Sequence, residues 1–289
     1  MKNLYKQISG KRFDQERALY NLNKTDVVNC IFAGSLDGES VLKECRNIRV
    51  LDCKFSLRYP LWHAKKFILK GCSMDELTRA PLWYSNDGKI ENCVIEGVKC
   101  LRECKNIQVD KTKIVSSEFG WRCKDLKINN STVDSVYFLF ESKNVQIDNL
   151  NMQGKYSFQY TKNLHIINSN LDTKDAFWHS KNVIVENSII KGEYLGWFSE
   201  NLTLINCKIV GTQPFCYCKN LKLVNCVMAQ TDLAFEYSSV DADVVGEIVS
   251  VKNPKSGIIL ADSIGEIIQD GAVVKCNCQI LLKENQISA

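Results

Sequence analysis

The sequence predicts an all-β fold, a single-stranded right-handed parallel β-helix with about 19 residues per coil and at least eleven coils. The first observation behind this prediction is a motif that returns at a constant step, as SKNVIVENSII from Ser180, SENLTLINCKI from Ser199 and CKNLKLVNCVM from Cys218. The second is that apolar residues alternate inside each motif, as in Val183-x-Val185, which is the periodicity of a strand. A helical period and the Leu-x-x-Leu-x-Leu frame of leucine-rich repeats are both absent, so stacked β-coils are the solenoid that fits.

Small side chains fill two columns, a column being a position that recurs from coil to coil. The first column keeps the constant step from Cys93 onward and has unequal steps upstream, so insertions enter only in the first coils. Its members are Cys30, Cys53, Cys72, Cys93, Thr112, Ser131, Leu150, Ser169, Ser188, Cys207 and Cys226. The second column consists of Cys45, Ala64, Ser85, Cys104, Cys123, Ser142, Thr161, Ser180, Ser199 and Cys218. Positions that accept Cys, Ser, Thr or Ala predict stacked, reduced thiols rather than disulfides.

Asparagine recurs at two corners of each predicted coil, for example at Asn187 and Asn182. Asn tolerates the left-handed backbone of a tight bend, and stacked amides can hydrogen-bond between coils, so we expect an asparagine ladder. The rise should be about 4.8 Å per coil, and strand twist predicts right-handed winding. We expect one β-helix domain over residues 1–289, with an N-terminal cap at 1–15, regular coils at 16–237 and atypical C-terminal coils at 238–289.

Composition gives expectations about partners and compartment. The 289 residues are 45% hydrophobic and carry a net charge of +4, which is too small to predict a nucleic acid or membrane partner. No apolar run resembles a secretory signal or a membrane span, so we expect a cytoplasmic protein. Cys216-x-Cys218 and Cys276-x-Cys278 lack a second ligand pair and a nearby His, so we expect no metal and no cofactor.

Several motifs outside the regular repeat point to a known family. They are ERALYN, DGES, RYPLWH, RAPLWY and SVKNPKSGIILADSIGEII, which lie between Glu16 and Ile268. With them the chain resembles a bacterial family of single-stranded right-handed β-helix proteins of unknown function, within the pectin-lyase-like superfamily. The resemblance implies the fold over nearly the whole chain and implies no activity. The Asn-Thr-Asp, Asp-Asp, Gly-His-Gly and Arg-Ile-Lys sets of pectate lyases and polygalacturonases are absent.

One column contains all five tryptophans. Its members are Tyr20, Lys43, Trp62, Trp83, Arg102, Trp121, Phe140, Gln159, Trp178, Trp197, Cys216 and Phe235. The preceding column, which includes Leu61 and Leu82, has no polar residue, and we place it inside. Because Lys43, Arg102 and Gln159 would be costly to bury, we interpret the tryptophan column as an outward, partly covered stripe. An interior filled with stacked indoles is the alternative.

Charged residues gather beside the first tryptophans, where coil length varies. The candidate ligand-binding residues are Arg58, Trp62, Arg79, Trp83, Tyr84 and Arg102. Arg58 and Arg79 could hold a carboxylate or phosphate, with a sugar between Trp62 and Trp83. Glu39, Glu103 and His63 are the candidate acids and bases. The alternative is a charge-paired ladder that seals the end of the helix, with both arginines paired to Glu16 and Glu39.

Acidic residues form a second group near the C-terminus. VDADVVGEIV and ILADSIGEII are separated by the same step as the regular motifs, which predicts that Asp243 stacks on Asp262 and Glu247 on Glu266. Such pairs have the close spacing of retaining glycosidase carboxylates, and oxygen ligands suit calcium. An exposed acidic edge, solvated or bridged by a cation, is the simpler interpretation.

Two classes of function follow from these features. One is binding, with or without processing, of a carbohydrate or a small anionic ligand on the outer face of aromatic, Arg and Glu residues. The other is a non-catalytic scaffold that binds proteins through its long sheets or forms a homo-oligomer. Exposure of the tryptophan column discriminates between them, and the sequence leaves enzymatic activity undecided.

Overall fold

The structure, a computed structural model, describes residues 5–35 and 38–283, so Asp37 of the DGES motif lies outside the described residues. It is all-β and forms a parallel β-solenoid of about 14 turns with about 19 residues per turn, which confirms the predicted fold class. The chain divides into two compact units, residues 1–146 and 147–289. The subdivision into cap, regular coils and atypical end stays a prediction. The described residues contain no helix long and apolar enough to span a membrane.

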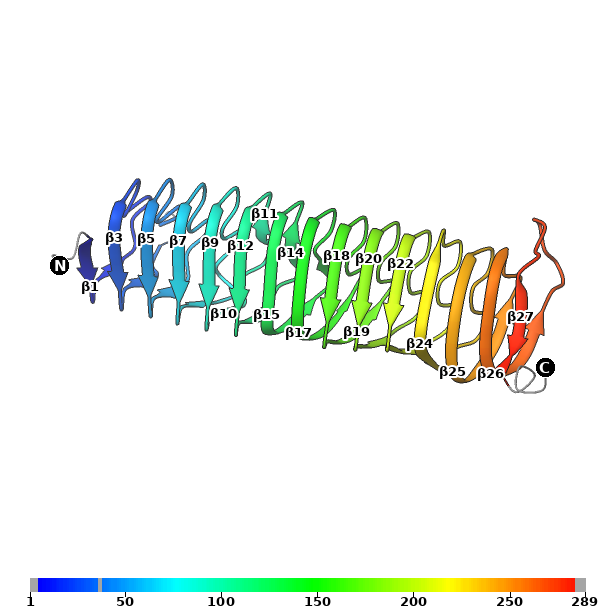
Figure 1. The fold of residues 1–289 in the computed structure, drawn as a ribbon. Helices are drawn as coiled ribbons and strands as arrows, with labels where there is room; N and C mark the ends of the chain where they lie inside the picture. The colour runs from blue at the N-terminus through cyan, green and yellow to red at the C-terminus, as the bar shows by residue number, and fades with distance from the viewer. Residues whose placement is uncertain (1–4, 36–37, 284–289) are drawn as a thin grey trace. The chain divides into compact units, whose positions relative to one another are not determined.

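The first unit stacks parallel strands coil upon coil, and β3, β5, β7, β9 and β12 lie side by side in Figure 1. The long side of its coils consists of β1 (Lys6–Ser9), β3 (Asn23–Val28), β5 (Arg46–Leu51), β7 (Lys65–Lys70), β9 (Asn86–Glu91), β12 (Lys105–Asp110) and β15 (Lys124–Ser135). A second side consists of β2 (Arg12–Phe13), β4 (Ile31–Phe32), β6 (Lys54–Phe55), β8 (Ser73–Met74), β10 (Val94–Ile95) and β13 (Lys113–Val115). A third, short sheet contains β11 (Cys100–Arg102), β14 (Glu118–Trp121) and β16 (Tyr137–Phe138).

The second unit repeats this arrangement. β17 (Lys143–Lys155) contains the boundary between the units. It is followed by β18 (Lys162–Ile167), β19 (Asn170–Lys174), β20 (Lys181–Glu186), β21 (Ile189–Lys191), β22 (Glu200–Ile205), β23 (Lys208–Val210), β24 (Leu221–Ala229), β25 (Ser239–Lys252), β26 (Ser256–Ile268) and β27 (Gln279–Leu282). β18, β20, β22 and β24 pair in parallel and lie side by side in Figure 1.

Stacked phenylalanine rings fill the core of each unit. The ring centroids of Phe32 and Phe55 are 4.7 Å apart in the first unit, and those of Phe158 and Phe177 are 5.0 Å apart in the second. The column placed inside from the sequence is buried throughout, at Leu61, Leu82, Leu101, Gly120, Leu139, Phe158, Phe177, Gly196, Phe215 and Ala234. Each apolar residue therefore packs on its counterparts in neighbouring coils, which is why the period of the coils was readable in the sequence.

The two small columns satisfy backbone groups at the corners of the coils. The Cys53 N–H donates to the sulfur of Cys72 at 3.4 Å, and the Thr112 N–H donates to the Ser131 hydroxyl at 3.2 Å. A buried N–H needs an acceptor, so these positions favour a small side chain that carries sulfur or oxygen. All fourteen cysteines are free thiols, as expected from the columns.

Burial should protect most of these thiols from modification. Twelve cysteines are buried, whereas Cys276 and Cys278 are half-buried. Burial raises the pKa of Cys45 to about 12 and that of Cys218 to about 11, so little thiolate forms near neutral pH. We expect an aromatic disulfide reagent to titrate at most two thiols quickly in the native protein, and all fourteen after unfolding without reductant. Fast reaction of more than two, or fewer than fourteen in total, would contradict the stacked-thiol account.

Asparagine side chains link neighbouring coils at the bends. Asn106 has a φ of 55° and Asn182 also 55°, which is the left-handed conformation expected at these corners. In the first unit the Asn106 amide donates to the carboxylate of Asp87 at 2.8 Å. In the second unit Asn182 donates to Asn163 at 3.1 Å, and Asn201 donates to Asn182 at 2.9 Å.

The last full coils are shorter than the repeat predicts. Val240 pairs with Gly257 rather than with Ile259, which lies one regular repeat further along the chain. The register shifts again between Val244 and Glu247, next to Gly246 with its φ of 82°. The predicted stacking of Asp243 on Asp262 and of Glu247 on Glu266 is therefore wrong. The register partners are Leu260 for Asp243, Ser263 for Glu247 and Ser250 for Glu266.

Candidate functional site

The tryptophan column faces outward, and all five indoles are half-buried. Alternate residues of the turn around Trp62 have a left-handed backbone conformation: Tyr59, Leu61 and His63 have φ values of 58°, 56° and 54°. Within this turn Leu61 is buried and Trp62 is half-buried. The interpretation of an outward, partly covered stripe is confirmed, and the alternative of an indole-filled interior is wrong.

Every indole N–H in this column donates to a backbone carbonyl in the next coil. The donor–acceptor pairs in the first unit are Trp62 to Ala80 at 2.6 Å, Trp83 to Lys99 at 2.6 Å and Trp121 to Tyr137 at 3.0 Å. Those in the second unit are Trp178 to Tyr194 at 2.6 Å and Trp197 to Gln213 at 2.8 Å. The polar atom of each tryptophan is therefore engaged within the chain.

Trp62 and Trp83 stack directly on each other. Their ring centroids are 5.3 Å apart and their planes differ by 6°. Stacked aromatic rings in contact have centroids in this range, so no third ring fits between them. The expectation of a sugar between Trp62 and Trp83 is wrong, because each indole face there is covered by the other indole.

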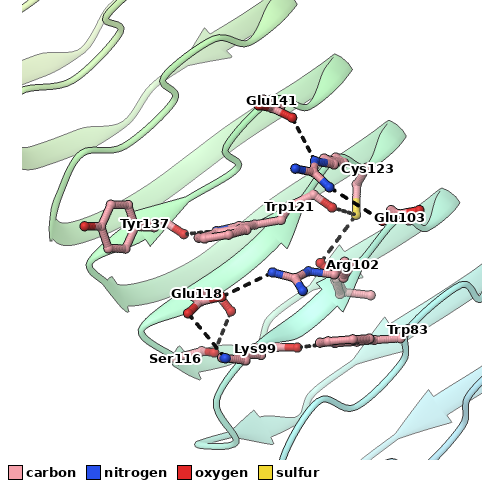
Figure 2. Close-up of polar contacts among 12 residues, drawn as sticks. Trp83, Lys99, Arg102, Glu103, Ser116, Glu118, Trp121, Cys123, Tyr137 and Glu141 are labelled. Carbon is pink, nitrogen blue, oxygen red and sulfur yellow. Dashed lines mark hydrogen bonds and ion pairs between the residues drawn. The ribbon is translucent and has the colours of Figure 1, made fainter.

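Arg102 occupies the next position of the same column and lies between two indoles. Its guanidinium carbon is 4.6 Å from the ring centroid of Trp83 and 5.0 Å from that of Trp121. Figure 2 shows the guanidinium directed at the carboxylate of Glu118, with a nitrogen–oxygen distance of 3.5 Å. Glu118 also lies 3.9 Å from the Lys99 ammonium. The Arg102 charge is thus already stabilised by two ring faces and a carboxylate.

Glu103 lies on the neighbouring column and belongs to a second charge cluster, also visible in Figure 2. Arg122 is 3.9 Å from Glu103 and donates to Glu141 at 2.8 Å. Glu141 raises the pKa of Arg122 through this hydrogen bond. The three side chains come from consecutive coils, so they form an ion-pair chain along the surface of the first unit.

Arg58 and Arg79 lie in adjacent coils, because the Tyr59 N–H donates to the Arg79 carbonyl at 2.8 Å. Arg58 pairs with Glu39 at 3.1 Å, as the ladder alternative expects. Arg79 is exposed, and no ion pair joins it to another residue in the part of the chain that the structure describes. Of the six candidate ligand-binding residues, Arg79 is the only exposed one, and the other five are half-buried.

The three candidate acids and bases do not converge. Glu39 is engaged by Arg58, and His63 lies 3.9 Å from Glu44 and packs against the Tyr84 ring at 5.2 Å. Tyr84 occupies the coil between His63 and Glu103, so these two are separated by two coils, or about 10 Å. An acid–base pair acting on one bond would need its members much closer together.

The ammonium of Lys283 lies beside the acidic residues near the C-terminus. It lies 2.9 Å from Asp243 and 3.3 Å from Asp262, and Asp262 also accepts the Gly246 N–H at 2.7 Å. The pKa of Asp262 is lowered, first by this backbone hydrogen bond and then by Lys283. The two carboxylates are therefore bridged by a cation of the chain itself, whereas Glu247 pairs with neither Asp262 nor Glu266 in the register.

Sequence reasoning missed a row of basic residues on the first unit. The residue that follows each member of the second small column in this unit is basic at five of six positions, namely Arg46, Lys65, Lys105, Lys124 and Lys143, and is Asn86 at the sixth. The signal was the same constant step that revealed the small columns. The row belongs to the regular repeat, whereas the candidate site residues lie where the repeat is broken.

Comparison with known proteins places the chain in a family. Residues 6–281 match the model of a family described as protein of unknown function, DUF3737. The chain belongs to this family. No curated protein matches the sequence significantly.

Solved structures with a similar fold include a surface adhesin, PfbA of Streptococcus pneumoniae. It has 7% sequence identity and a TM-score of 0.44, with 90% of this chain and 82% of the adhesin covered. The A-module of the Azotobacter vinelandii mannuronan C-5 epimerase AlgE4 has 10% identity and a TM-score of 0.36, with 96% of this chain and 91% of the module covered. At these values the likeness to either protein carries no argument about function.

Proposed function

We propose that this DUF3737 protein is a non-catalytic interaction solenoid, and that the charged aromatic face of its first unit stabilises the coils. The observation that carries the proposal is the position of Arg102. Its guanidinium lies between the indoles of Trp83 and Trp121 and faces Glu118, and its side chain is 25% exposed. A cation covered on both faces by indoles from neighbouring coils, with a carboxylate of the same chain beside it, links those coils.

The arrangement of the carboxylates supports a non-catalytic role. Glu39 and Glu103 each lie beside an arginine, and His63 is not adjacent to either. General acid–base catalysis needs a donor and an acceptor within reach of the same bond, and ion-paired carboxylates on different coils do not supply this. The long exposed sheets of the solenoid then remain as the surfaces through which the protein acts.

A carbohydrate or small anionic ligand is the second candidate, and Arg79 is the observation that favours it. Its guanidinium is exposed next to the Arg58–Glu39 pair of the adjacent coil. An arginine in this position could bind a carboxylate or phosphate through two parallel hydrogen bonds. Such a ligand would lie on the edge of the charged face, beside the stacked indoles rather than between them.

Matched alanine variants of the two arginines test both candidates. We expect Arg102→Ala to lower the free energy of unfolding by about 1–2 kcal/mol, because it removes two cation–π contacts and an ion pair. Arg79→Ala should change it by less than about 0.5 kcal/mol, as is usual for an exposed residue. Urea unfolding followed by tryptophan fluorescence measures both. Equal, small losses would contradict the stabilising role of the face.

A binding measurement on the wild-type protein and the Arg79→Ala variant tests the second candidate, which is ligand binding. If galacturonate or a sugar phosphate changes the tryptophan fluorescence of the wild-type protein but not that of Arg79→Ala, the face binds a ligand at Arg79. If neither compound changes the fluorescence of the wild-type protein up to millimolar concentration, the ligand-binding candidate is rejected and the interaction solenoid is the remaining proposal.

A further inference from the structure

Asp175 is a buried acidic residue of the second unit whose carboxylate has no partner. It is the first residue after β19, and only 6% of it is exposed. Its backbone is satisfied, because its N–H donates to the Glu193 carbonyl at 2.9 Å and its carbonyl accepts the Gln159 amide at 3.0 Å. Its carboxylate forms no hydrogen bond and no ion pair within residues 5–35 and 38–283. Burying a charge in this way is costly.

Three charged residues surround Asp175, and each is engaged elsewhere. Lys174, which ends β19, lies 2.5 Å from Glu193 in the turn after β21, and 5.3 Å from the Tyr194 ring. Lys155, which ends β17, lies 4.5 Å from the ring of the tyrosine that follows it. The two lysines favour the ionised form of Asp175, whereas Glu193 opposes it. Burial outweighs the lysines and raises the pKa of the Asp175 carboxyl above its ordinary value.

The first unit has an acid at the equivalent repeat position, and there it is paired. Glu118 precedes Asp175 by three regular steps in the sequence. Its carboxylate lies 3.9 Å from the Lys99 ammonium and 3.5 Å from the Arg102 guanidinium, as Figure 2 shows. The positions of the second unit that correspond to these two cations hold uncharged residues, Tyr156 and Gln159. Asp175 thus keeps the negative charge of this position without the cations that neutralise it in the first unit.

We propose that Asp175 is a pH-sensitive element of the second unit, which favours the folded coils when its carboxyl is protonated and weakens them when it ionises. Below about pH 4 the carboxyl is protonated in both the folded and the unfolded chain. As the pH rises, the unfolded chain loses this proton first, because the folded-state pKa is the higher of the two. The free energy of unfolding therefore falls as the pH rises through the folded-state pKa. This inference goes beyond the proposed function and does not depend on it.

The test compares Asp175→Asn with the control Asp172→Asn in the full-length protein. Asp172 lies in the same strand region, and its carboxylate pairs with Lys191 at 3.1 Å. Melting temperatures are measured from about pH 4 to about pH 7, which spans the ionisation of a raised carboxyl. Asparagine also suits the left-handed backbone at Asp175, where φ is 53°, but that benefit does not change with pH. The pH dependence of the difference from the wild type therefore isolates the carboxyl.

We expect Asp175→Asn to raise the melting temperature at pH 7 by about 2 °C, and this gain to shrink by at least about half at pH 4. Asp172→Asn should raise the melting temperature at neither pH, because it removes an ion pair rather than an unpaired charge. No gain for Asp175→Asn at pH 7, or a gain of equal size at both pH values, would overturn the proposal.

A second variant, Gln159→Arg, supplies the cation that the first unit has at the equivalent position. The introduced guanidinium should face Asp175 as that of Arg102 faces Glu118. It should raise the melting temperature at pH 7 in the wild-type background, and have less than about half that effect when combined with Asp175→Asn. An equal effect in both backgrounds would show that the new cation does not act through Asp175, and would contradict the proposal.

Discussion

Replacing Phe55 by alanine should lower the free energy of unfolding by about 3–5 kcal/mol. Phe55 is 1% exposed and stacks on Phe32 at 4.7 Å, so the substitution leaves a cavity that one neighbouring coil cannot fill. In a solenoid each coil contacts only its neighbours, so the loss should be concentrated in the first unit. Urea unfolding monitored by circular dichroism provides the measurement.

Lys54→Ala is the matched control for this substitution, since Lys54 precedes Phe55 in β6 and is exposed. It should change the free energy of unfolding by less than about 0.5 kcal/mol. A loss below about 1.5 kcal/mol for Phe55→Ala would mean that the phenylalanine stack is not part of the stabilising core.

Gly88→Ala should destabilise the protein by about 3 kcal/mol, near the upper end for overpacked cores. A Cβ atom at Gly88 would lie 2.1 Å from the Phe67 ring, and Phe67 is only 1% exposed. The glycine is thus required by the close approach of the aromatic ring of the preceding coil. Thermal unfolding of the variant measures the effect.

A double variant tests the cause of this destabilisation. Phe67→Leu removes the ring atoms that the new methyl group would meet, so Gly88→Ala should cost about 1 kcal/mol or less in that background. If Gly88→Ala is equally costly with Leu at position 67, the destabilisation does not come from this contact.

The fold was predictable because a solenoid stacks each residue on its own repeat. The constant step between Ser169 and Ser188 reports a direct contact, since the Ser169 N–H donates to the Ser188 hydroxyl at 3.0 Å. The C-terminal coils were mispredicted for the converse reason. There the similar motifs containing Asp243 and Asp262 are still separated by the regular step, but the coil between them is shorter. Residues at equivalent positions of the two motifs are therefore not paired between β25 and β26.

The candidate site was only partly predictable. The outward direction of the tryptophan column followed from Arg102 and Gln159, which are costly to bury. The hydrogen-bond partners of these side chains could not be predicted. The indole N–H of Trp83 and the amide of Gln159 donate to backbone carbonyls, and every residue type has a backbone carbonyl. The stacking of Trp62 on Trp83 depends on the left-handed residue before each indole, a conformation that Leu61 and its neighbours do not signal.

Hydrogen exchange of the five indole N–H groups tests most directly whether the outer aromatic face is structural. In a spectrum of the ¹⁵N-labelled protein, all five indole resonances should be protected, with exchange slowed as far as that of backbone amides in the neighbouring strands. This follows because every indole N–H donates to a backbone carbonyl at 2.6–3.0 Å. Rapid exchange of the Trp62 and Trp83 signals in the folded protein would contradict the account, because their N–H groups would then be free to bind a ligand.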